Sequence, residues 1–428
     1  MQAIADHPLR YHLANELHAR PFPTAAAPGW AAFLALKPTE GAARDRQAER
    51  AHLLMLLDRF GSPHPQPEAT HWYGPLGRNW LKWESHTEFV TYTALGAGLE
   101  GRPFDPAQFE VFPADWLAAA PGARLTSALF RIEVASDDAQ VGAKAEAWLV
   151  PESLAVSRIL GDELVTAADF RIDPAGHMRF AVFVRPGVSE QRVGRVVQRL
   201  CEIETYKAMA MLGFAQARAL APEMAELDRS LTALVAGMAG VTKAEETLHD
   251  LLAVSSALEA LIARSSFRFR ATVAYETIVK QRVEVLREEG FEGRQTLEEF
   301  MTRRFDPAMR TAASADGRLQ AMADRAIRAG DLLRTRVDVE RSAQNQRLLE
   351  SMDRRADQAL RLQHTVEGLS VVAISYYAVG LALYLLGPLA EEVGKAWVAA
   401  AVTPLVVLAT WLGLRRVRKA LAAGRADH

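Results

Sequence analysis

Two long apolar segments near the C-terminus constrain this chain more than any other feature. Residues 369–386 and 396–414 carry no charged side chain, and only the short link 387–395 separates them. The hydrocarbon core of a bilayer is about 30 Å thick, and a helix needs about 20 apolar residues to cross it. A soluble helix of this length normally has a polar face, which neither segment has. We therefore predict a transmembrane hairpin of helices 366–387 and 396–414.

Basic residues flank the outer ends of this hairpin. They are Arg354, Arg355 and Arg361 before the first segment, and Arg415, Arg416, Arg418 and Lys419 after the second. The link between the segments instead carries Glu391 and Glu392 against a lone Lys395. Lys and Arg near the ends of a span tend to stay on the cytoplasmic side. We expect a multi-pass protein with both termini in the cytoplasm and with Glu391 and Glu392 in a small external acidic loop.

The charge balance and the cysteine content limit the classes of function. The chain has 50 Lys and Arg against 52 Asp and Glu, so no positive field favours nucleic acid as a partner. Cys201, the single cysteine, cannot form an intramolecular disulfide and fits a reducing compartment. The Gly-x-x-x-x-Gly-Lys-Ser/Thr, Gly-x-Ser-x-Gly and His-Glu-x-x-His patterns do not occur. We expect a protein that is not an enzyme.

Residues 1–186 indicate an α/β domain with a mostly antiparallel sheet. They contain short segments rich in β-branched and aromatic residues, with partial alternation, which is typical of strands. The predicted strands are 30–36, 80–84, 88–94, 125–134, 163–172 and 178–184. The predicted helices are 46–60 and 138–149.

Residues 187–365 have a different, helical texture. Long tracts rich in Ala, Leu, Arg and Glu cover 189–237, 242–289 and 296–363. The clearest expected interruptions are residues 290–293 and 306–307. Long helices of this kind usually pair with each other or with partner chains. The whole chain is thus predicted to be α+β: an α/β domain, a long-helix stalk, two transmembrane helices and a basic cytosolic tail at 415–428.

One face of the helix that enters the membrane carries no charge. We call this face the seam; it is reached from Asn345 by alternate steps of four and three residues. Its members are Asn345, Leu349, Met352, Ala356, Ala359, Gln363, Val366, Ser370, Ala373, Tyr377, Gly380, Tyr384 and Gly387. Such a face either packs against other helices, in a coiled coil or within the chain, or lines a pore made by several copies. Both interpretations stay open, and we expect a homo-oligomer.

A second candidate site lies in the α/β domain. Glu84, His86 and Glu88 alternate in sequence, so in a strand their side chains would share one face. Two carboxylates and an imidazole form a ligand set for a divalent cation. An exposed strand face with ordinary polar residues explains the same pattern. Further along, Glu202 and Tyr206 are four residues apart in a predicted helix, which is typical of a structural hydrogen bond.

Short motifs in order along the chain point to a family. They are residues 7–10, 15–22, 83–89, 198–200, 202–206, 265–269, 303–304, 332–337, 365–370 and 376–377. The segment 83–89, for example, reads Trp-Glu-Ser-His-Thr-Glu-Phe. These motifs resemble a bacterial family of membrane-anchored proteins defined by a domain of unknown function, number 3422. The resemblance covers nearly the whole chain and implies the inner membrane as location, but it implies no activity.

The architecture resembles, more distantly, the CorA-type divalent-cation transporters. These also join an α/β domain and long helices to a stalk helix that runs into the first span, and Gln344-Asn345 is similar to their stalk sequence. The resemblance implies ion transport with a divalent cation. The chain departs from it at residues 384–388, which read Tyr-Leu-Leu-Gly-Pro where CorA-type proteins have Gly-Met-Asn. The alternative function is a membrane-tethered scaffold or regulatory protein that binds a protein partner or small ligand.

Overall fold

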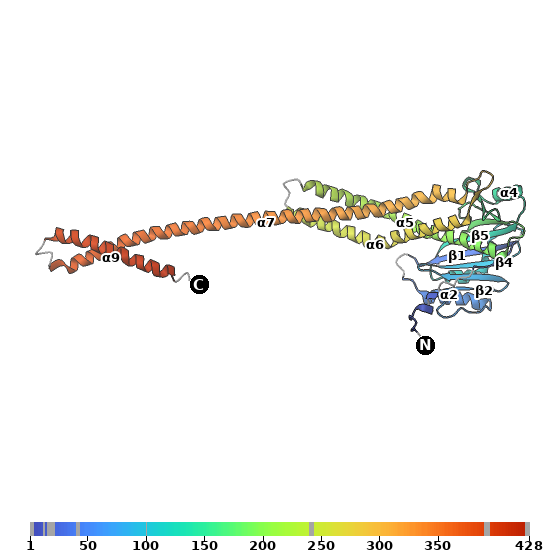
Figure 1. The fold of residues 1–428 in the computed structure, drawn as a ribbon, viewed down its shortest axis with the longest axis horizontal. Coiled ribbons are helices and arrows are strands. Elements are labelled where there is room, and N and C mark those ends of the chain that lie inside the picture. The colour runs from blue at the N-terminus through green and yellow to red at the C-terminus, as the bar shows by residue number, and fades with distance from the viewer. Residues whose placement is uncertain are drawn as a thin grey trace. The chain divides into compact units, whose positions relative to one another are not determined.

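The computed structural model describes residues 4–11, 13–14, 22–39, 43–99, 101–238, 244–388 and 394–423, with side chains to residue 417. The chain forms two compact units, Met1–Gly330 and Asp331–His428. The helices named below are α2 (Arg46–Arg59), α3 (Ala114–Ala118), α4 (Asp138–Trp148), α5 (Glu190–Gly237), α6 (Ala244–Leu286), α7 (Leu297–Leu385) and α9 (Lys395–Ala423). Helix α7 begins in the first unit and ends in the second (Figure 1).

The first unit is built on one sheet, which in the described part of the chain has the strand order β2-β3-β4-β1-β5-β8-β7-β6-β9. The strands are β1 Gly29–Lys37, β2 His71–Leu76, β3 Asn79–Ser85, β4 Val90–Ala97, β5 Ala123–Val134, β6 Ala155–Ile159, β7 Leu164–Ala168, β8 Met178–Val184 and β9 Glu289–Gly290. Strands β5 and β8 pair in parallel, and the other neighbours pair antiparallel. The predicted α+β class and mostly antiparallel sheet are confirmed.

The sequence did not predict strands β2 and β6. Strand β2 contains Gly74 and Pro75, which are poor strand formers and are tolerated here because β2 lies at an edge of the sheet. Strand β6 is only five residues long and follows directly on a short 3-10 turn at Pro151–Ser153. Neither segment gives the long alternating pattern that marks a strand.

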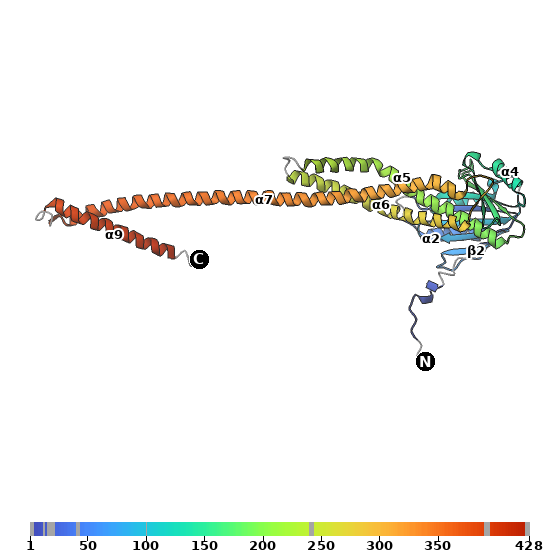
Figure 2. The same ribbon diagram turned by 45° about the horizontal axis from the view of Figure 1, so that its top comes forward.

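Alternate side chains of the sheet enter two separate cores. One face, with Phe33 and Phe130, packs against α5, α6 and the first turns of α7. The other face, with Leu34 and Phe183, packs against α2, α3 and α4. Both views of the ribbon show the three long helices extending beyond the sheet (Figures 1 and 2). The period-two alternation of strand side chains makes this three-layer arrangement possible.

The long helices follow the predicted tracts with one correction. The segment between α6 and α7 does interrupt the helical run, as expected for residues 290–293. Residues 306–307 do not, because α7 continues through Pro307. Pro307 is exposed, so its ring points into solvent and the helix tolerates the missing N–H there.

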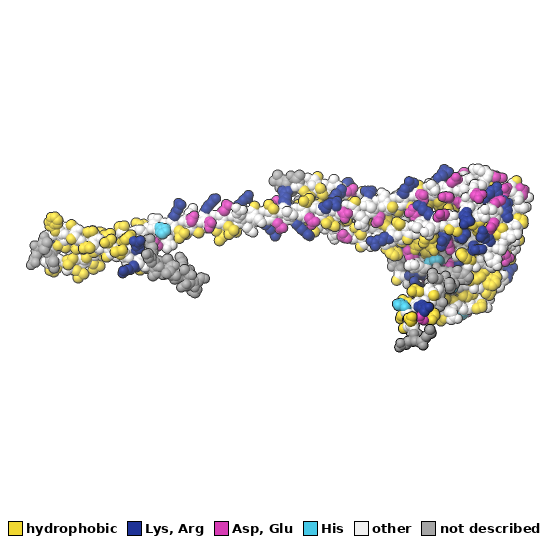
Figure 3. Space-filling view, viewed as in Figure 1, with side chains coloured by type: hydrophobic (Ala, Val, Ile, Leu, Met, Phe, Trp, Pro, Cys, Tyr) yellow, Lys and Arg dark blue, Asp and Glu magenta, His cyan; other side chains and the backbone are white. Residues whose placement is uncertain are grey.

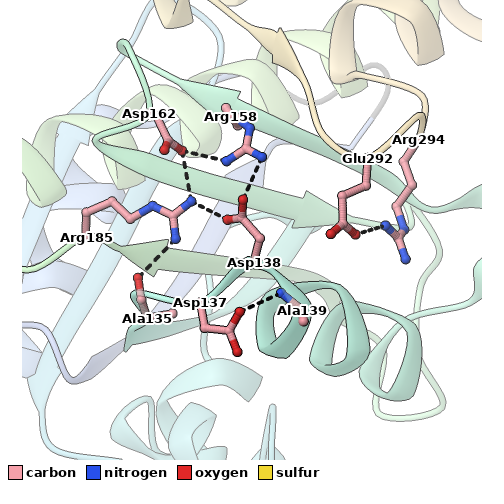
Figure 4. Close-up of polar contacts among 9 residues, drawn as sticks. All are labelled: Ala135, Asp137, Asp138, Ala139, Arg158, Asp162, Arg185, Glu292 and Arg294. Carbon is pink, nitrogen blue, oxygen red and sulfur yellow. Dashed lines mark hydrogen bonds and ion pairs between the residues drawn. The ribbon is translucent and has the colours of Figure 1, made fainter.

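An ion-pair network closes the end of the sheet near α4 (Figure 4). Asp138, in the first turn of α4, pairs with Arg158 of β6 at 2.7 Å and with Arg185 after β8. Asp162 pairs with both arginines, at 3.1 and 3.0 Å. The two arginines lower the pKa of Asp138, because their hydrogen bonds favour the charged carboxylate. Each arginine thus contacts both carboxylates, and the two positive charges of the network are balanced by two negative charges.

The second unit holds the rest of α7 and α9. The C-terminal end of α7 and the segment Lys395–Val417 are long and apolar enough to span a membrane. Hydrophobic side chains cover the paired ends of these helices in the space-filling view (Figure 3). Helix α7 ends at Leu385 and α9 begins at Lys395, and the predicted bounds at 366 and 414 lie inside these continuous helices.

Candidate functional site

Two of the three predicted metal ligands lie beyond the end of β3. The strand ends at Ser85, and His86 and Glu88 lie in the turn that leads into β4. Only Glu84 lies in the strand, where it is buried and 3.2 Å from the Lys82 ammonium. The prediction of one shared strand face is therefore wrong, because the chain turns after Ser85.

Arg44 holds one side of this turn. Its guanidinium donates to both carboxylate oxygens of Glu49, at 2.9 and 2.8 Å. It also donates to the Ser85 hydroxyl at 2.8 Å and to the carbonyl oxygen of His86. A guanidinium has five N–H groups in a fixed fork, so one arginine positions several acceptors of the turn at once.

Helix α6 holds the other side through Glu88. Arg268 forms an ion pair with one carboxylate oxygen of Glu88, and the Tyr275 hydroxyl donates to the other at 2.8 Å. Burial, followed by the hydrogen bond to Glu88, raises the pKa of Tyr275 above its ordinary value, so the phenol stays protonated and donates. Glu88 has both oxygens engaged and serves to fix the turn to α6.

A polar pocket opens beside the turn. Its outer part has a volume of about 350 Å³, and its lining includes Arg46, Thr70, His86, Phe89, Tyr206 and Tyr275. His86, Phe89 and Tyr206 also line an inner cavity of about 20 Å³ between the sheet and α5. The inner lining includes Glu84, Thr91, Thr93, Gln198, Glu202 and Thr205. Glu202 and Tyr206 thus share a face of α5, and the hydrogen bonds described for Glu202 come from Gln198 and Arg282, not from Tyr206.

The inner cavity is rich in hydrogen-bond acceptors. Glu202 accepts from the Gln198 side-chain N–H at 2.8 Å and from Arg282. The Gln198 oxygen is buried and has no hydrogen-bond partner in the described part of the chain. A cavity of this volume holds about one water molecule, which would donate to that oxygen. Among the described residues, no group of three or more His, Cys, Asp or Glu side chains is placed to hold a metal ion, so the geometry does not support the predicted divalent-cation site.

Cys201 also lines the inner cavity. Its thiol is fully buried, and burial raises its pKa well above the ordinary value. A thiol that stays protonated is a poor nucleophile and a poor metal ligand. The inner cavity therefore contains no activated sulfur.

Several large side chains of the seam are exposed in the second unit of the single chain. Leu349 and Met352 are 65% and 58% exposed, and within the span Tyr377 and Tyr384 are 71% and 87% exposed. Ser375, on a different face of α7, is 5% exposed, and α9 lies beside this part of α7 in both ribbon views (Figures 1 and 2). The hairpin therefore does not use Tyr377 and Tyr384 for its own packing.

Other members of the seam are placed as follows. Asn345 and Gln363 are exposed in α7 before the apolar segment, Gly380 is exposed within it, and Ser370 is half-buried. The predicted external acidic loop, Glu391 and Glu392, lies outside the described residues.

Comparison with known proteins identifies the family. The profile of a family described as a protein of unknown function, DUF3422, matches residues 5–421. The chain belongs to this family. No curated protein and no solved structure matches the chain, and these comparisons give no support to a CorA resemblance. The wider expectation of an uncharacterised family with a C-terminal apolar hairpin holds.

In this DUF3422 chain, separate motifs meet at the pocket. Residues 83–89 cover the end of β3 and the turn that follows it. Residues 198–206 of α5 supply Gln198 and Glu202 to the inner cavity. The segment 265–269 contributes Arg268, which pairs with Glu88. These motifs are far apart in sequence. Each motif could be recognised in the sequence, but its proximity to the others in the fold could not be predicted.

Sequence reasoning also missed Arg44 and Tyr275 as parts of this DUF3422 site. Arg44 lies 41 residues before Ser85, and Tyr275 lies 187 residues after Glu88. No local spacing rule connects side chains at such separations. The nearest sequence signal was the mixture of Arg and Phe within 264–270, a pattern that is also typical of an exposed helix face.

Proposed function

We propose that this protein is a homo-oligomer anchored in a bacterial inner membrane, whose copies associate through the seam of α7. Both termini lie in the cytoplasm, as the flanking basic residues favour. The observation that carries the proposal is that the seam is uncharged, exposed in a single chain, and continuous from Asn345 into the apolar hairpin. Burial of apolar surface between copies contributes about 25 cal/mol per Å².

The residues beside the seam support an assembly of more than two copies. With Leu349 and Met352 at the a and d positions of a heptad, the e and g positions between residues 346 and 362 hold Gln346, Asp353 and Arg355 as well as three leucines. The leucines are Leu348, Leu360 and Leu362, which are 60%, 54% and 68% exposed. At these three positions the apolar stripe is wider than the a and d seam of a two-stranded coiled coil. The f positions, on the opposite face, hold Arg347, Arg354 and Arg361.

The polar members of the seam favour identical partners. Membrane insertion gives every copy the same orientation, so the helices associate in parallel. In register, Asn345 meets Asn345 and Gln363 meets Gln363, and each amide both donates and accepts a hydrogen bond. A polar residue in such a layer specifies register in coiled coils. A second copy of this chain is therefore the partner that fits the seam.

Cysteine cross-linking in membranes tests this association. Met352→Cys lies on the seam, and Arg354→Cys lies on the opposite face of the same helical turn. Because Cys201 is buried, it does not interfere. We expect Met352→Cys to form disulfide-linked dimers under mild oxidation and Arg354→Cys to stay monomeric, since a disulfide requires Cα atoms about 4.4–6.8 Å apart.

The same experiment contradicts the proposal if Met352→Cys remains monomeric under conditions that oxidise exposed thiols. Equal cross-linking of Met352→Cys and Arg354→Cys has the same meaning, because it shows random collision without a preferred face.

In this assembly the α/β domain acts as a membrane-tethered scaffold or binding module. Its pocket is held rigidly by Arg44 and Arg268, and its polar lining suits a small ligand. No catalytic step is assigned to the domain.

Ion conduction through the assembly is a second candidate function. The observation that favours it is the exposure of the Tyr377 and Tyr384 hydroxyl-bearing side chains within the span, since such groups need hydrogen-bond partners in a bilayer. Copies arranged around one axis would supply those partners and a polar path. Divalent cations are the ions to test, because the sequence analysis expects them.

Flux into liposomes checks this second candidate. We expect reconstituted protein to carry magnesium or manganese into the vesicles and the double variant Asn345→Leu, Tyr377→Leu to lower the rate at least about tenfold. Arg354→Gln, on the opposite face, is the control. An unchanged rate in the double variant would place any flux outside the seam.

A further inference from the structure

A groove between α5 and α7 collects arginines in the first unit. It has a volume of about 370 Å³. Helix α5 contributes Arg218, and α7 contributes Arg310 and Arg318. The floor is apolar: Ala217 is 3% exposed and Met224 is 2% exposed. Small side chains on the floor create the hollow, and the cationic groups stand at its rim.

The spacing of these residues directs them to one place. Arg310, Ser314 and Arg318 follow each other at intervals of four, so they share one face of α7. Arg218 faces them from α5. About two helical turns after Arg318, Arg325 of α7 forms an ion pair with Asp228 of α5 at 2.6 Å. This ion pair joins the two helices beside the groove.

In the part of the chain that the structure describes, the three groove arginines are paired with no carboxylate. Within the residues that the structure describes, Arg218, Arg310 and Arg318 form no ion pair, and the Arg218 guanidinium lies 5.8 Å from the centre of the Phe214 ring. Other arginines of this unit do have carboxylate partners, as Arg158 and Arg185 have in Asp138 and Asp162 (Figure 4). The groove lining holds three arginines and no acidic side chain, in a chain with formal net charge −2.

We propose that this groove binds a phosphorylated ligand, whose phosphoryl oxygens are held by Arg218, Arg310 and Arg318. A planar guanidinium donates two parallel hydrogen bonds to phosphate, which makes arginine well suited to this role. The Ser314 hydroxyl lies on the same face and supplies a further donor. Three cations match a group with several negative charges, such as a diphosphate, and the apolar floor accommodates an uncharged part of the ligand.

Binding of inorganic pyrophosphate to the purified full-length protein in detergent tests the proposal by calorimetry at low salt. We expect the unaltered protein to bind and the variant Arg310→Gln, Arg318→Gln to bind at least about tenfold more weakly, since each charge-assisted hydrogen-bonded contact is lost. The matched control is Arg229→Gln, Arg270→Gln, which removes two exposed arginines outside the groove. It should change the affinity by less than about twofold.

Competition identifies the source of the phosphoryl group. Mixed micelles containing phosphatidylglycerol displace pyrophosphate if the natural ligand is a lipid headgroup, and leave it bound if the ligand is a soluble phosphorylated molecule. No binding by the unaltered protein at millimolar pyrophosphate overturns the proposal. Equal affinity of the groove variant and the unaltered protein, with equal melting temperatures, also overturns it. The groove lies within one chain, so a failure of self-association would leave this result unaffected.

Discussion

At the scale of single residues, Gly213 sets how closely α5 approaches α6. A Cβ atom at this position would lie 2.0 Å from the Thr272 hydroxyl oxygen, far inside van der Waals contact. The hydroxyl of Thr272 already donates to the Arg268 carbonyl oxygen at 2.8 Å. The same helical turn of α6 therefore supports the Arg268 backbone, whose side chain holds Glu88 at the pocket.

We predict that Gly213→Ala destabilises the first unit and that Gly317→Ala stabilises it. Alanine is favoured over glycine in a helix by about 1 kcal/mol. At Gly317 nothing lies within 4 Å of the added Cβ, so that gain is realised. At Gly213 overpacking costs about 1–3 kcal/mol and exceeds it.

Denaturant unfolding followed by tryptophan fluorescence measures both changes. The tryptophans at 30, 72, 80, 83, 116 and 148 report on the first unit. A Gly213→Ala variant as stable as Gly317→Ala would show that α5 and α6 do not pack as closely as described here.

Residue identities were easier to predict than residue neighbours. Glu84, His86 and Glu202 all line the pocket, yet the expected common face of Glu84, His86 and Glu88 failed. Residues 86–89 join β3 to β4 as a hairpin, but they contain no Gly, Asn or Asp, the residues that usually mark such a turn in a sequence. The ion pair between Arg268 and Glu88 joins side chains 180 residues apart, and no sequence spacing encodes such a contact.

At the scale of elements, hydropathy and a composition rich in helix-forming residues were sufficient to predict the long helices. The absence of charge over 369–386 and 396–414 has a single structural consequence, an apolar helix, and therefore needs no tertiary information. Strand β2 is the opposite case. Its Gly74 and Pro75 are acceptable only because the rest of the sheet places β2 at an edge, which the segment itself does not reveal.

Helix α7 contains one feature that the sequence predicts and one that it does not. Its seam could be read from the sequence, but whether α9 covers that face could not. The burial of Ser375 and the exposure of Tyr377 and Tyr384 place α9 on another face and leave the seam available to a second copy.

At the scale of the whole molecule, the chain consists of three parts to which we assign separate roles: the hairpin, the seam of α7 and the α/β domain with its helices. In the proposed function the hairpin would attach the chain to the membrane, the seam would supply contacts between copies, and the α/β domain with its helices would supply two polar sites. The pocket beside His86 and the groove at Arg310 both lie within the first unit, so each copy carries its own pair. Association through the seam would concentrate these sites at the membrane surface, which raises avidity for a multivalent partner.

The mass of the purified protein in detergent tests the central claim most directly. Light scattering with the detergent contribution subtracted should give a constant multiple of the chain mass, greater than two, over a wide range of protein concentration. Met352→Asp, which places a charge on the seam, should reduce that mass, and Arg354→Asp on the opposite face should not. A mass of one chain for the unaltered protein at every concentration would contradict association through α7.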